Sequence, residues 1–512
     1  MNSTNHLVAI LEIGSTGIRL LIAEIGENRQ WKTLDQAGKP VALGRDVFTS
    51  GEVSRESFLE CLLVLRNYQE LLSGWGISRD NVHVIATSAL RVARNRDMFV
   101  DRVRQETGFL LTIVEGIEEN RLMYLAVRSA LKNDLSQFRR SNSMIIDVGG
   151  GSTEIMLLRK GKMVAAHSLH LGTILIGQYF RHSPDTLQSQ GRYLRENVRN
   201  TSEFLNADME LDHVKVFVIA GSDARFLATR IGKELNDDCW IIERDAFVRF
   251  VDTIRNYSPE ECVKNLQVPY SDSEGFVPGN LVYKLFLERT SAVQVVVPFV
   301  SIREGLLIDL TLGVDPELQE EFYSQIIASA VNLGRKYHFD EAHNLHVAFL
   351  CNILFDALAR EHGMNRRERV MLEVAATLHD IGMFIRGSGH HKHGQYIVAN
   401  SEIFGLHREE LGIIANVIRY HRSDPPSQAD IDYIALQREE RILVLKMASI
   451  LRLADALDRG HSQRIGNITV ERRNETVVLH TGGNFDVSSE LMGIEEKGDM
   501  FQDTFGYKVM LT

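Results

Sequence analysis

Short apolar runs and amphipathic segments alternate along the first part of the chain. Apolar runs at 7–13 and 18–25 lie on either side of a glycine-containing turn, which predicts two strands joined in a hairpin. Segments 82–97, 110–131 and 214–231 each begin as an apolar, strand-like run and continue with helical spacing. Strands that alternate with helices in this way predict an α/β fold.

The pattern changes near residue 313. From 322 to 457 apolar positions recur three and four residues apart with few strand signals, which predicts a separate helical domain. The tail from 467 to 512 has strand-like runs on either side of a helical segment at 488–497, which predicts a small α+β cap. The expected domains are two α/β lobes, an all-α domain and the cap: 1–135, 136–313, 314–462 and 463–512.

The segment IIDVGGGSTEIML, residues 145–157, repeats the plan of the first hairpin. When LEIGSTGIRLLI is set beside IDVGGGSTEIML, Glu12 aligns with Asp147 and Arg19 aligns with Glu154. Each copy has an acidic residue, a glycine turn and a second strand, which suggests two halves built on one plan that face each other across a cleft. Chance similarity of two hairpins is the alternative.

Composition and charge limit the classes of ligand. The chain has 512 residues, which suggests several domains, and its 57 Lys and Arg against 68 Asp and Glu give a net charge of -11. This balance argues against broad binding to nucleic acid or to an acidic membrane, so a polyanionic ligand needs a local site. Four scattered cysteines without a CxxC pair, no basic leader and no membrane-length apolar run predict a cytoplasmic protein.

The three consecutive glycines behind Asp147 are suited to binding phosphate. Backbone N–H groups without blocking side chains can surround phosphate oxygens. The carboxylate of Asp147 would repel phosphate unless a cation lay between them, and Mg²⁺ bound by carboxylates and phosphate oxygens removes that conflict. The sequence therefore predicts a metal-phosphate site, with a simple tight turn as the alternative.

Six separated segments carry a family resemblance: LEIGSTGIRLLIAEI, ATSALRVARN, EGIEENRLMY, IIDVGGGSTEI, AGSDARF and SIREGLL. In this order they resemble the exopolyphosphatase/guanosine pentaphosphate phosphohydrolase family over about the first 310 residues. The resemblance implies two actin-like lobes with the ribonuclease H-like fold of the actin, sugar kinase and heat-shock protein (ASKHA) superfamily. It also implies release of terminal phosphate from inorganic polyphosphate or from pppGpp, and a homodimer.

The resemblance places the catalytic glutamate at Glu119, the second acid of EGIEENRL. A carboxylate there can orient or deprotonate the attacking water, although Glu118 and Glu119 also fit the acidic first turn of a helix. Arg91 matches a family arginine, with an exposed helix arginine as the alternative. The expected phosphate-binding residues are Gly14, Ser15, Thr16, Arg19, Arg91, Gly149, Gly150, Gly151 and Ser152. The expected Mg²⁺ or Mn²⁺ ligands of the cleft are Glu12, Asp147 and Glu154.

Two segments depart from the family pattern. The usual Asp-x-Gly-Ser-Asn-Ser becomes Glu12-Ile13-Gly14-Ser15-Thr16-Gly17, and GTSGT becomes AGSDA. The departures leave the preference between polyphosphate and pppGpp open. They also leave open a sensor that binds these ligands without turnover. An actin-like kinase would need an adenosine pocket and an aspartate base, whereas this chain has the glutamate motif.

Histidine is concentrated in the predicted helical domain, which holds 11 of the 18 histidines between His338 and His461. The adjacent pair His379-Asp380, with one histidine upstream and one aspartate downstream, resembles the HD phosphohydrolase domain. A shared divalent metal would satisfy such polar groups on a buried face, and satisfied core histidines are the alternative. The expected metal ligands of this domain are His343, His379, Asp380, His393, His421 and Asp455.

Overall fold

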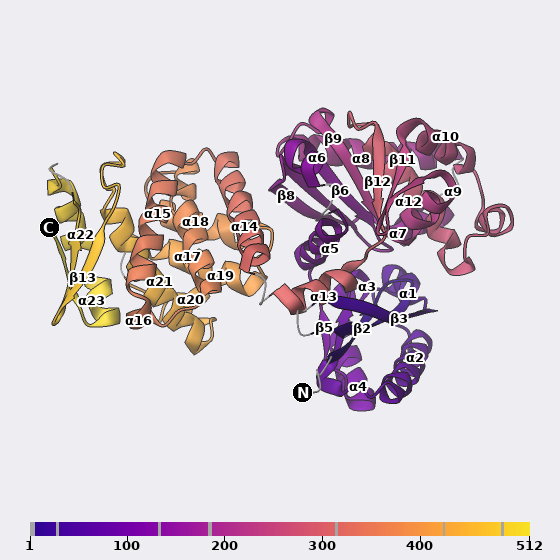
Figure 1. The fold of residues 1–512 in the computed structure, drawn as a ribbon, viewed down its shortest axis with the longest axis horizontal. Helices are drawn as coiled ribbons and strands as arrows, with labels where there is room; N and C mark the ends of the chain where they lie inside the picture. Colours follow the sequence, from indigo (N-terminus) through magenta and orange to yellow (C-terminus); the bar gives the residue numbers. More distant parts are fainter. Residues whose placement is uncertain are drawn as a thin grey trace. The chain divides into compact units, whose positions relative to one another are not determined.

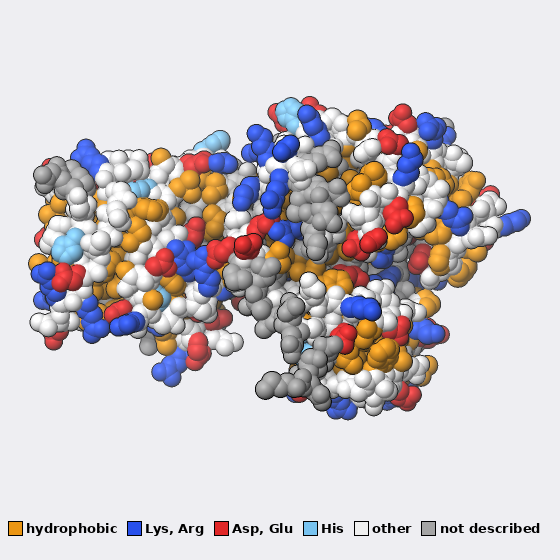
Figure 2. All heavy atoms as spheres, in the orientation of Figure 1, with side chains coloured by type: hydrophobic (Ala, Val, Ile, Leu, Met, Phe, Trp, Pro, Cys, Tyr) orange, Lys and Arg blue, Asp and Glu red, His pale blue; other side chains and the backbone are white. Residues whose placement is uncertain are grey.

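The computed structural model describes residues 6–26, 30–131, 135–182, 187–312, 316–422, 425–482 and 486–512 (Figure 1). The chain divides into two compact units, Met1–Glu320 and Glu321–Thr512. On the face drawn in Figure 2, acidic and basic side chains are interspersed, as the modest negative charge leads one to expect. Among the described residues, no helix combines the length and apolarity needed to cross a bilayer.

The first lobe of the first unit is a five-stranded sheet in the order β3-β2-β1-β4-β5. β1 pairs antiparallel with β2 and parallel with β4. The strands are β1 (His6–Ile13), β2 (Gly17–Ile25), β3 (Trp31–Pro40), β4 (Val82–Ala86) and β5 (Leu111–Ile113). The helices up to residue 140 are α1 (Leu43–Ser50), α2 (Arg55–Gly74), η1 (Arg79–Asn81), α3 (Ser88–Val92), α4 (Arg96–Thr107), α5 (Gly116–Ala130) and α6 (Leu135–Arg140), of which α6 contacts β6 of the second sheet.

The second lobe has seven strands in the order β10-β11-β12-β9-β6-β7-β8. The run β12-β9-β6-β7-β8 repeats the order and strand directions of the first sheet, because β6 is antiparallel to β7 and parallel to β9. The strands are β6 (Asn142–Val148), β7 (Thr153–Arg159), β8 (Lys162–Leu169), β9 (Val214–Ala220), β10 (Lys233–Asn236), β11 (Cys239–Glu243) and β12 (Gln294–Pro298). The predicted duplication is thus confirmed at the level of the sheets.

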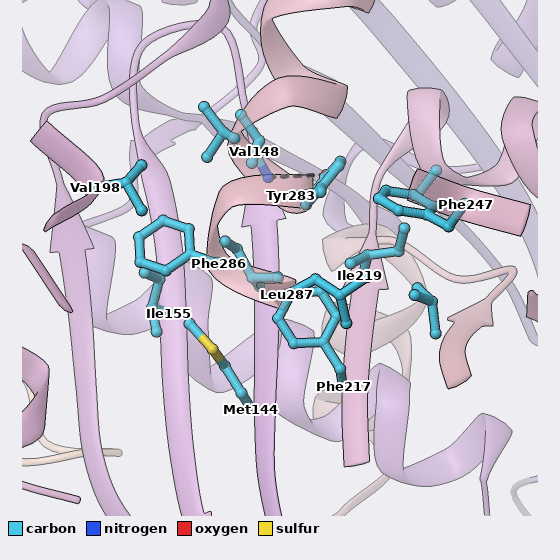
Figure 3. Packing of buried hydrophobic residues seen from close by; sticks show 14 of the residues in the cluster. Met144, Val148, Ile155, Val198, Phe217, Ile219, Phe247, Tyr283, Phe286 and Leu287 are labelled. Carbon is cyan, nitrogen blue, oxygen red and sulfur yellow. Dashed lines mark hydrogen bonds between the residues drawn. The ribbon is translucent and has the colours of Figure 1, made fainter. Parts of the chain in front are cut away.

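Helices cover the second sheet and enclose a large apolar core. Figure 3 shows Met144, Phe217 and Phe286 packed in it, and all three are fully buried. Tyr283 adds a polar tie: its hydroxyl donates to the carbonyl of Ala220 at 2.6 Å and accepts from the Val148 N–H at 3.1 Å. The helices are α7 (Thr173–His182), α8 (Leu187–Asn206), η2 (Leu211–His213), α9 (Ser222–Ile231), α10 (Arg244–Ile254), α11 (Pro259–Glu261), the π-helical η3 (Cys262–Leu266), α12 (Tyr270–Leu287) and α13 (Ile302–Leu312).

Helices α5 and α13 pack against each other, and each also contacts a sheet: α5 contacts β8 of the second lobe, and α13 contacts β1 of the first. Their approach is close, since a Cβ on Gly305 would lie 2.0 Å from the carbonyl oxygen of Leu122. Arg121 joins the helices through paired hydrogen bonds to Glu118, both 2.7 Å, and to Asp309, at 2.7 and 2.9 Å. The start of α5 is therefore rigidly held between the lobes.

The second unit is mostly helical and ends in a three-stranded sheet, β13-β14-β15. Its central helices α15, α17, α19 and α21 pack against one another. The helices are α14 (Pro316–Lys336), α15 (Glu341–Ala357), α16 (Ala359–His362), α17 (Arg366–Leu378), η4 (Ile381–Phe384), α18 (His390–Ala399), α19 (Arg408–Arg419), α20 (Ile431–Ile434), α21 (Arg438–Ala456), α22 (Ser488–Lys497) and α23 (Asp499–Phe505). The strands are β13 (Thr469–Arg473), β14 (Thr476–His480) and β15 (Lys508–Leu511).

Candidate active site

The two glycine hairpins have the same register. In the first, Glu12 lies opposite Arg19, and in the second, Asp147 lies opposite Glu154. The sequence alignment, which set Glu12 beside Asp147 and Arg19 beside Glu154, thus matched equivalent positions of the two hairpins. Each turn also closes with one backbone hydrogen bond of 2.9 Å, from Gly14 to Gly17 and from Gly149 to Ser152.

The glycines of the second hairpin allow residues of the first lobe to pack closely against it. A Cβ on Gly151 would lie 2.1 Å from the ring of Phe48 and 2.8 Å from the Ser88 hydroxyl, both in the first lobe. A Cβ on Gly150 would lie 2.8 Å from the Cβ of Ser15. The missing side chains are therefore required for close contact between the hairpin and the opposite lobe, a reason that the sequence analysis did not include.

A cavity of about 440 Å³ lies between the two hairpins. Its walls include most of the residues predicted for phosphate and metal binding: Glu12, Gly14, Ser15, Thr16, Arg19, Glu119, Asp147, Gly149, Gly150, Ser152 and Glu154. Arg91 and Gly151 are not in its lining. Gly151 lies under Phe48, and the guanidinium of Arg91 is engaged with the protein.

Glu119 lies in the first turn of α5 and is buried. Arg91 donates from Nη1 to Oε1 of Glu119 and, at 2.9 Å, to the carbonyl of Val114. Burial raises the pKa of Glu119 to about 7, even though the positive charge of Arg91 acts in the opposite direction. A carboxyl group with this pKa can exchange a proton near neutral pH, which suits a general base. Its neighbour Glu118 is instead held by Arg121.

Glu154, predicted as a metal ligand, is largely occupied by hydrogen bonds. Its Oε1 accepts from the hydroxyls of Ser152 and Ser168, both at 2.8 Å, and its Oε2 accepts from Asn120 at 3.1 Å. Burial and the nearby charge of Glu119 raise its pKa well above the usual value. These contacts tie β7 and β8 to the start of α5, so Glu154 fixes the surroundings of Glu119 more than it offers lone pairs to the cavity.

Two other carboxyl groups in the cavity wall have no such partners. Asp147 and Asp223 accept no hydrogen bond from any residue in the described ranges. Burial, followed by the charge of Glu12, raises the pKa of Asp147 to about 6. Burial, followed by the charge of Asp272, raises the pKa of Asp223 to about 7. Carboxylates that are desolvated, close together and unpaired fit a divalent cation.

Three arginines lie near the acidic residues of the cavity wall. Arg19 and Arg303 approach Glu12 at 3.6 and 3.3 Å, and Arg19 also donates to the Thr16 hydroxyl at 3.2 Å. Arg225 lines the cavity, and burial lowers its pKa. Guanidinium groups bind phosphate oxygens well, so both charges needed for a metal-phosphate ligand are present.

In the second unit, His343, His379, Asp380 and Asp455 come together. His343 donates from Nδ1 to Asp458 at 2.8 Å, and His379 donates from Nδ1 to the carbonyl of Ala376 at 2.7 Å. The Nε2 atoms are therefore lone-pair acceptors in the neutral rings, and both are buried without a hydrogen-bond partner. They lie 3.7 and 3.9 Å from Oδ1 of Asp455.

A second pair of imidazoles, those of His390 and His421, lies beside Oδ1 of Asp380. His390 and His421 donate from Nδ1 to backbone carbonyls at 2.9 and 2.7 Å, and their Nε2 atoms lie only 3.2 Å apart. These Nε2 atoms are 3.1 and 3.7 Å from Oδ1 of Asp380. The prediction of His393 needs correction: the structure brings His390 into this group, where its Nε2 lies beside Asp380 and its Nδ1 donates to the carbonyl of Gly387.

Both units match family models. A model of the Ppx/GppA phosphatase family matches residues 21–313, more than half of the 512-residue chain. The chain belongs to the Ppx/GppA phosphatase family. A model of Ppx/GppA phosphatase domain III matches residues 327–492, so the second unit of this Ppx/GppA phosphatase also has its counterpart in the family.

Named relatives agree with this assignment. A guanosine-5'-triphosphate,3'-diphosphate pyrophosphatase from Pseudoalteromonas atlantica is 24% identical over 472 residues, which cover 88% of this Ppx/GppA phosphatase and 86% of the relative. An exopolyphosphatase structure from Cytophaga hutchinsonii is 19% identical with a TM-score of 0.54, covering 60% of this chain and 99% of that one. A family member from Aquifex aeolicus is 24% identical with a TM-score of 0.50 and the same coverages. These structures show that the two lobes have the fold of solved members of this family.

Sequence reasoning missed Asp223, Arg225 and Arg303 of this Ppx/GppA phosphatase, although all three lie in segments quoted for the family resemblance. A signal for Asp223 was available. It follows the glycine turn after β9, and β9 is parallel to β6. The ends of adjacent parallel strands meet at one sheet edge, so Asp223 had to lie near Asp147.

Proposed function

We propose that this Ppx/GppA phosphatase releases terminal orthophosphate from inorganic polyphosphate in the cleft between the actin-like lobes. The observation that carries the proposal is Glu119: a buried carboxyl group with a pKa of about 7, hydrogen-bonded to Arg91, in the wall of a cavity between two glycine hairpins. Phosphoryl transfer to water needs a positioned water molecule and positive charge around the phosphate oxygens. The cleft has groups for both tasks.

In this proposal Glu119 orients the attacking water and accepts its proton, while Arg91 keeps the carboxylate in one orientation. The N–H groups of the glycine turns, together with Arg19 and Arg225, bind phosphate oxygens of the chain. The enclosed cavity limits access of bulk water to the reacting group. Glu154 keeps its hydrogen-bonded position and holds the wall beside Glu119 in place.

We further propose that a divalent cation, Mg²⁺ or Mn²⁺, belongs to the cleft. The unpaired carboxyl groups of Asp147 and Asp223 fit such an ion, with Glu12 nearby and Glu154 as the more constrained member of the predicted set. The oxygen-only donor set suits these hard cations. When bound, the ion would neutralise charge on the phosphate oxygens during transfer.

Phosphate release from long-chain polyphosphate tests the proposal. With Mg²⁺, the wild-type protein and the control variant Glu118→Gln should release phosphate, because Glu118 pairs with Arg121 away from the cavity. Glu119→Gln should lose at least about 100-fold in kcat, the scale of general base catalysis. Equal rates for Glu119→Gln and wild type would refute the assigned role.

Hydrolysis of pppGpp to ppGpp is the second candidate, because several relatives carry the name guanosine-5'-triphosphate,3'-diphosphate pyrophosphatase. The reaction at the phosphoanhydride bond is the same. The ratio of kcat/KM for polyphosphate and for pppGpp decides between them. Tight binding of either compound without phosphate release would instead favour a sensor, an outcome that the altered Glu12–Gly17 turn allows.

For the second unit we propose an HD-type helical domain that binds a divalent metal. Four imidazoles each donate a hydrogen bond from Nδ1 to a carbonyl or carboxylate, which places four buried Nε2 atoms beside Asp380 and Asp455, those of His343 and His379 without a hydrogen-bond partner. The two Nε2 atoms without a hydrogen-bond partner, both beside carboxylates, favour a metal over satisfied core histidines. The fit supports a metal centre, with His390 in place of His393.

Whether this centre hydrolyses a substrate is tested with His379→Ala. Polyphosphate hydrolysis that survives this change and disappears in Glu119→Gln locates the reaction in the cleft. The opposite pattern moves it to the helical domain. The resemblance also leads us to propose a cytoplasmic homodimer whose C-terminal residues form a cap, and light scattering of the purified chain measures its mass directly.

A further inference from the structure

Lys497 brings a positive charge to the histidine-aspartate cluster of the second unit. It is the last residue of α22, and its ammonium group forms an ion pair with Oδ2 of Asp455. The other oxygen of Asp455, Oδ1, is the one that faces Nε2 of His343 and His379. The side chains of Lys497 and Asp455 are only 14% and 13% exposed, so the ion pair is largely shielded from water.

The backbone that carries this lysine is firmly held against α21. Buried Arg452 donates from Nε to the carbonyl oxygen of Lys497 at 3.2 Å and from Nη2 to Asp499 at 2.9 Å. The helices approach closely, because a Cβ on Gly493 would lie 3.1 Å from the Cβ of Ala456. The backbone of Lys497 is thus held by Arg452 and its ammonium group by Asp455, which keeps the positive charge at the cluster.

Positively charged partners are scarce at the carboxylates of this cluster. Among the described residues, it is the only lysine or arginine joined by an ion pair to Asp380 or Asp455. A buried carboxylate needs a positive partner, and Lys497 supplies one to Asp455 in the metal-free protein. A divalent ion bound by the same carboxylate would have to enter against that ammonium charge, which repels it strongly in surroundings of low dielectric constant.

We propose that Lys497 is a built-in counter-ion of the metal centre, which stabilises the metal-free state and lowers the affinity of the centre for divalent cations. This inference rests on metal binding by the second unit, as proposed above. A contrasting role predicts the opposite change in metal affinity. If Lys497 acted mainly by orienting Asp455 toward the imidazoles, its removal would weaken metal binding. Metal affinity therefore discriminates between the two roles.

The experiment is a Co²⁺ titration of the full-length, chelator-treated protein, followed by the visible absorption of Co²⁺. Excess Mg²⁺ is kept present to fill the oxygen-only site of the cleft, since imidazole ligands favour Co²⁺ over Mg²⁺. Lys497→Met removes the charge, and Lys497→Arg keeps it. Arg459→Gln is the matched control, because it breaks an exposed ion pair between Arg459 and Glu496 of the same helix. His379→Ala should abolish the absorption and so identifies the site.

Lys497→Met should bind Co²⁺ at least about tenfold more tightly than wild type, whereas Lys497→Arg and Arg459→Gln should match wild type. Without metal the melting temperature of Lys497→Met should fall, and Co²⁺ should raise it by more than in wild type. Equal or weaker binding by Lys497→Met overturns the counter-ion role while leaving the metal proposal intact. Absence of Co²⁺ absorption in every variant overturns both, and absorption in Lys497→Met alone supports the counter-ion role.

Discussion

Removal of Arg91 should change the pH at which the enzyme works. Arg91 is the positive partner of Glu119, and both side chains are largely buried, at 14% and 11% exposure. In the wild type, burial has already raised the pKa of Glu119 to about 7 against the attraction of Arg91. Loss of an adjacent opposite charge typically changes a carboxyl pKa by about 1 to 3. The Arg91→Met variant should therefore hold Glu119 protonated well above neutral pH.

The effect on rate follows from the ionised fraction of Glu119. A carboxyl group with a pKa of about 7 is half ionised at pH 7, and a rise of about 2 reduces that fraction to about 1%. If the carboxylate is the active form, kcat/KM of Arg91→Met at pH 7 should fall about 50-fold and recover as the pH is raised. The acidic limb of the pH profile moves to higher pH, because activity requires loss of the proton.

The assay is phosphate release from polyphosphate as a function of pH for wild type, Arg91→Met and Arg91→Lys. The lysine variant keeps a positive charge near Glu119, so its acidic limb should stay closer to that of wild type. The free energy of unfolding, measured at each pH, separates loss of folded protein from loss of the base. An acidic limb that stays in place or moves to lower pH in Arg91→Met would show that Arg91 does not lower the pKa of the group that controls this limb, and would refute the assignment of the limb to Glu119 paired with Arg91.

Three further predictions concern stability. Without divalent metal, the free energy of unfolding should fall as the pH rises from about 4 through about 7, because the folded protein holds protons on Asp147 and Asp223 that the unfolded chain has already lost; urea unfolding across this range checks it, and a stability that rises with pH contradicts it. Gly151→Ala should lower stability by about 1–3 kcal/mol and reduce phosphate release, whereas Gly177→Ala, whose added Cβ meets no neighbouring atom within 4 Å, should do neither. Arg121→Met should cost about 3 kcal/mol in thermal or urea unfolding, because two acidic side chains lose their shared partner, and an unchanged midpoint would show that these ion pairs contribute nothing.

Local patterns in the sequence predicted the hairpins of the cleft well. Two apolar runs on either side of a glycine turn predict each hairpin, and the repeated pattern shows that Glu12 and Asp147, and likewise Arg19 and Glu154, occupy equivalent positions, as the registers confirm. Such patterns do not show which side chains from other segments contact these residues. Whether Glu154 has open lone pairs depends on side chains from three elements, and local periodicity carries no information about them.

The helical unit shows the same limit. His390 and His393 are three residues apart and lie on nearly the same face of a helix, so spacing cannot decide which one reaches Asp380. In the structure it is His390, the first residue of α18, whose Nε2 lies 3.1 Å from Oδ1 of Asp380. Lys497 could not be assigned to the cluster from the sequence, because only the packing of α22 on α21 brings it to Asp455.

The contact of Gly150 and Gly151 with the first lobe also sets a mechanical limit. The lobes can approach each other only until their atoms are in contact. Here the contact is formed by glycine backbone against Ser15, Ser88 and the ring of Phe48. Any side chain at these positions would act as a spacer and hold the lobes apart. The approach of the lobes at this point is thus limited by the thickness of the main chain alone.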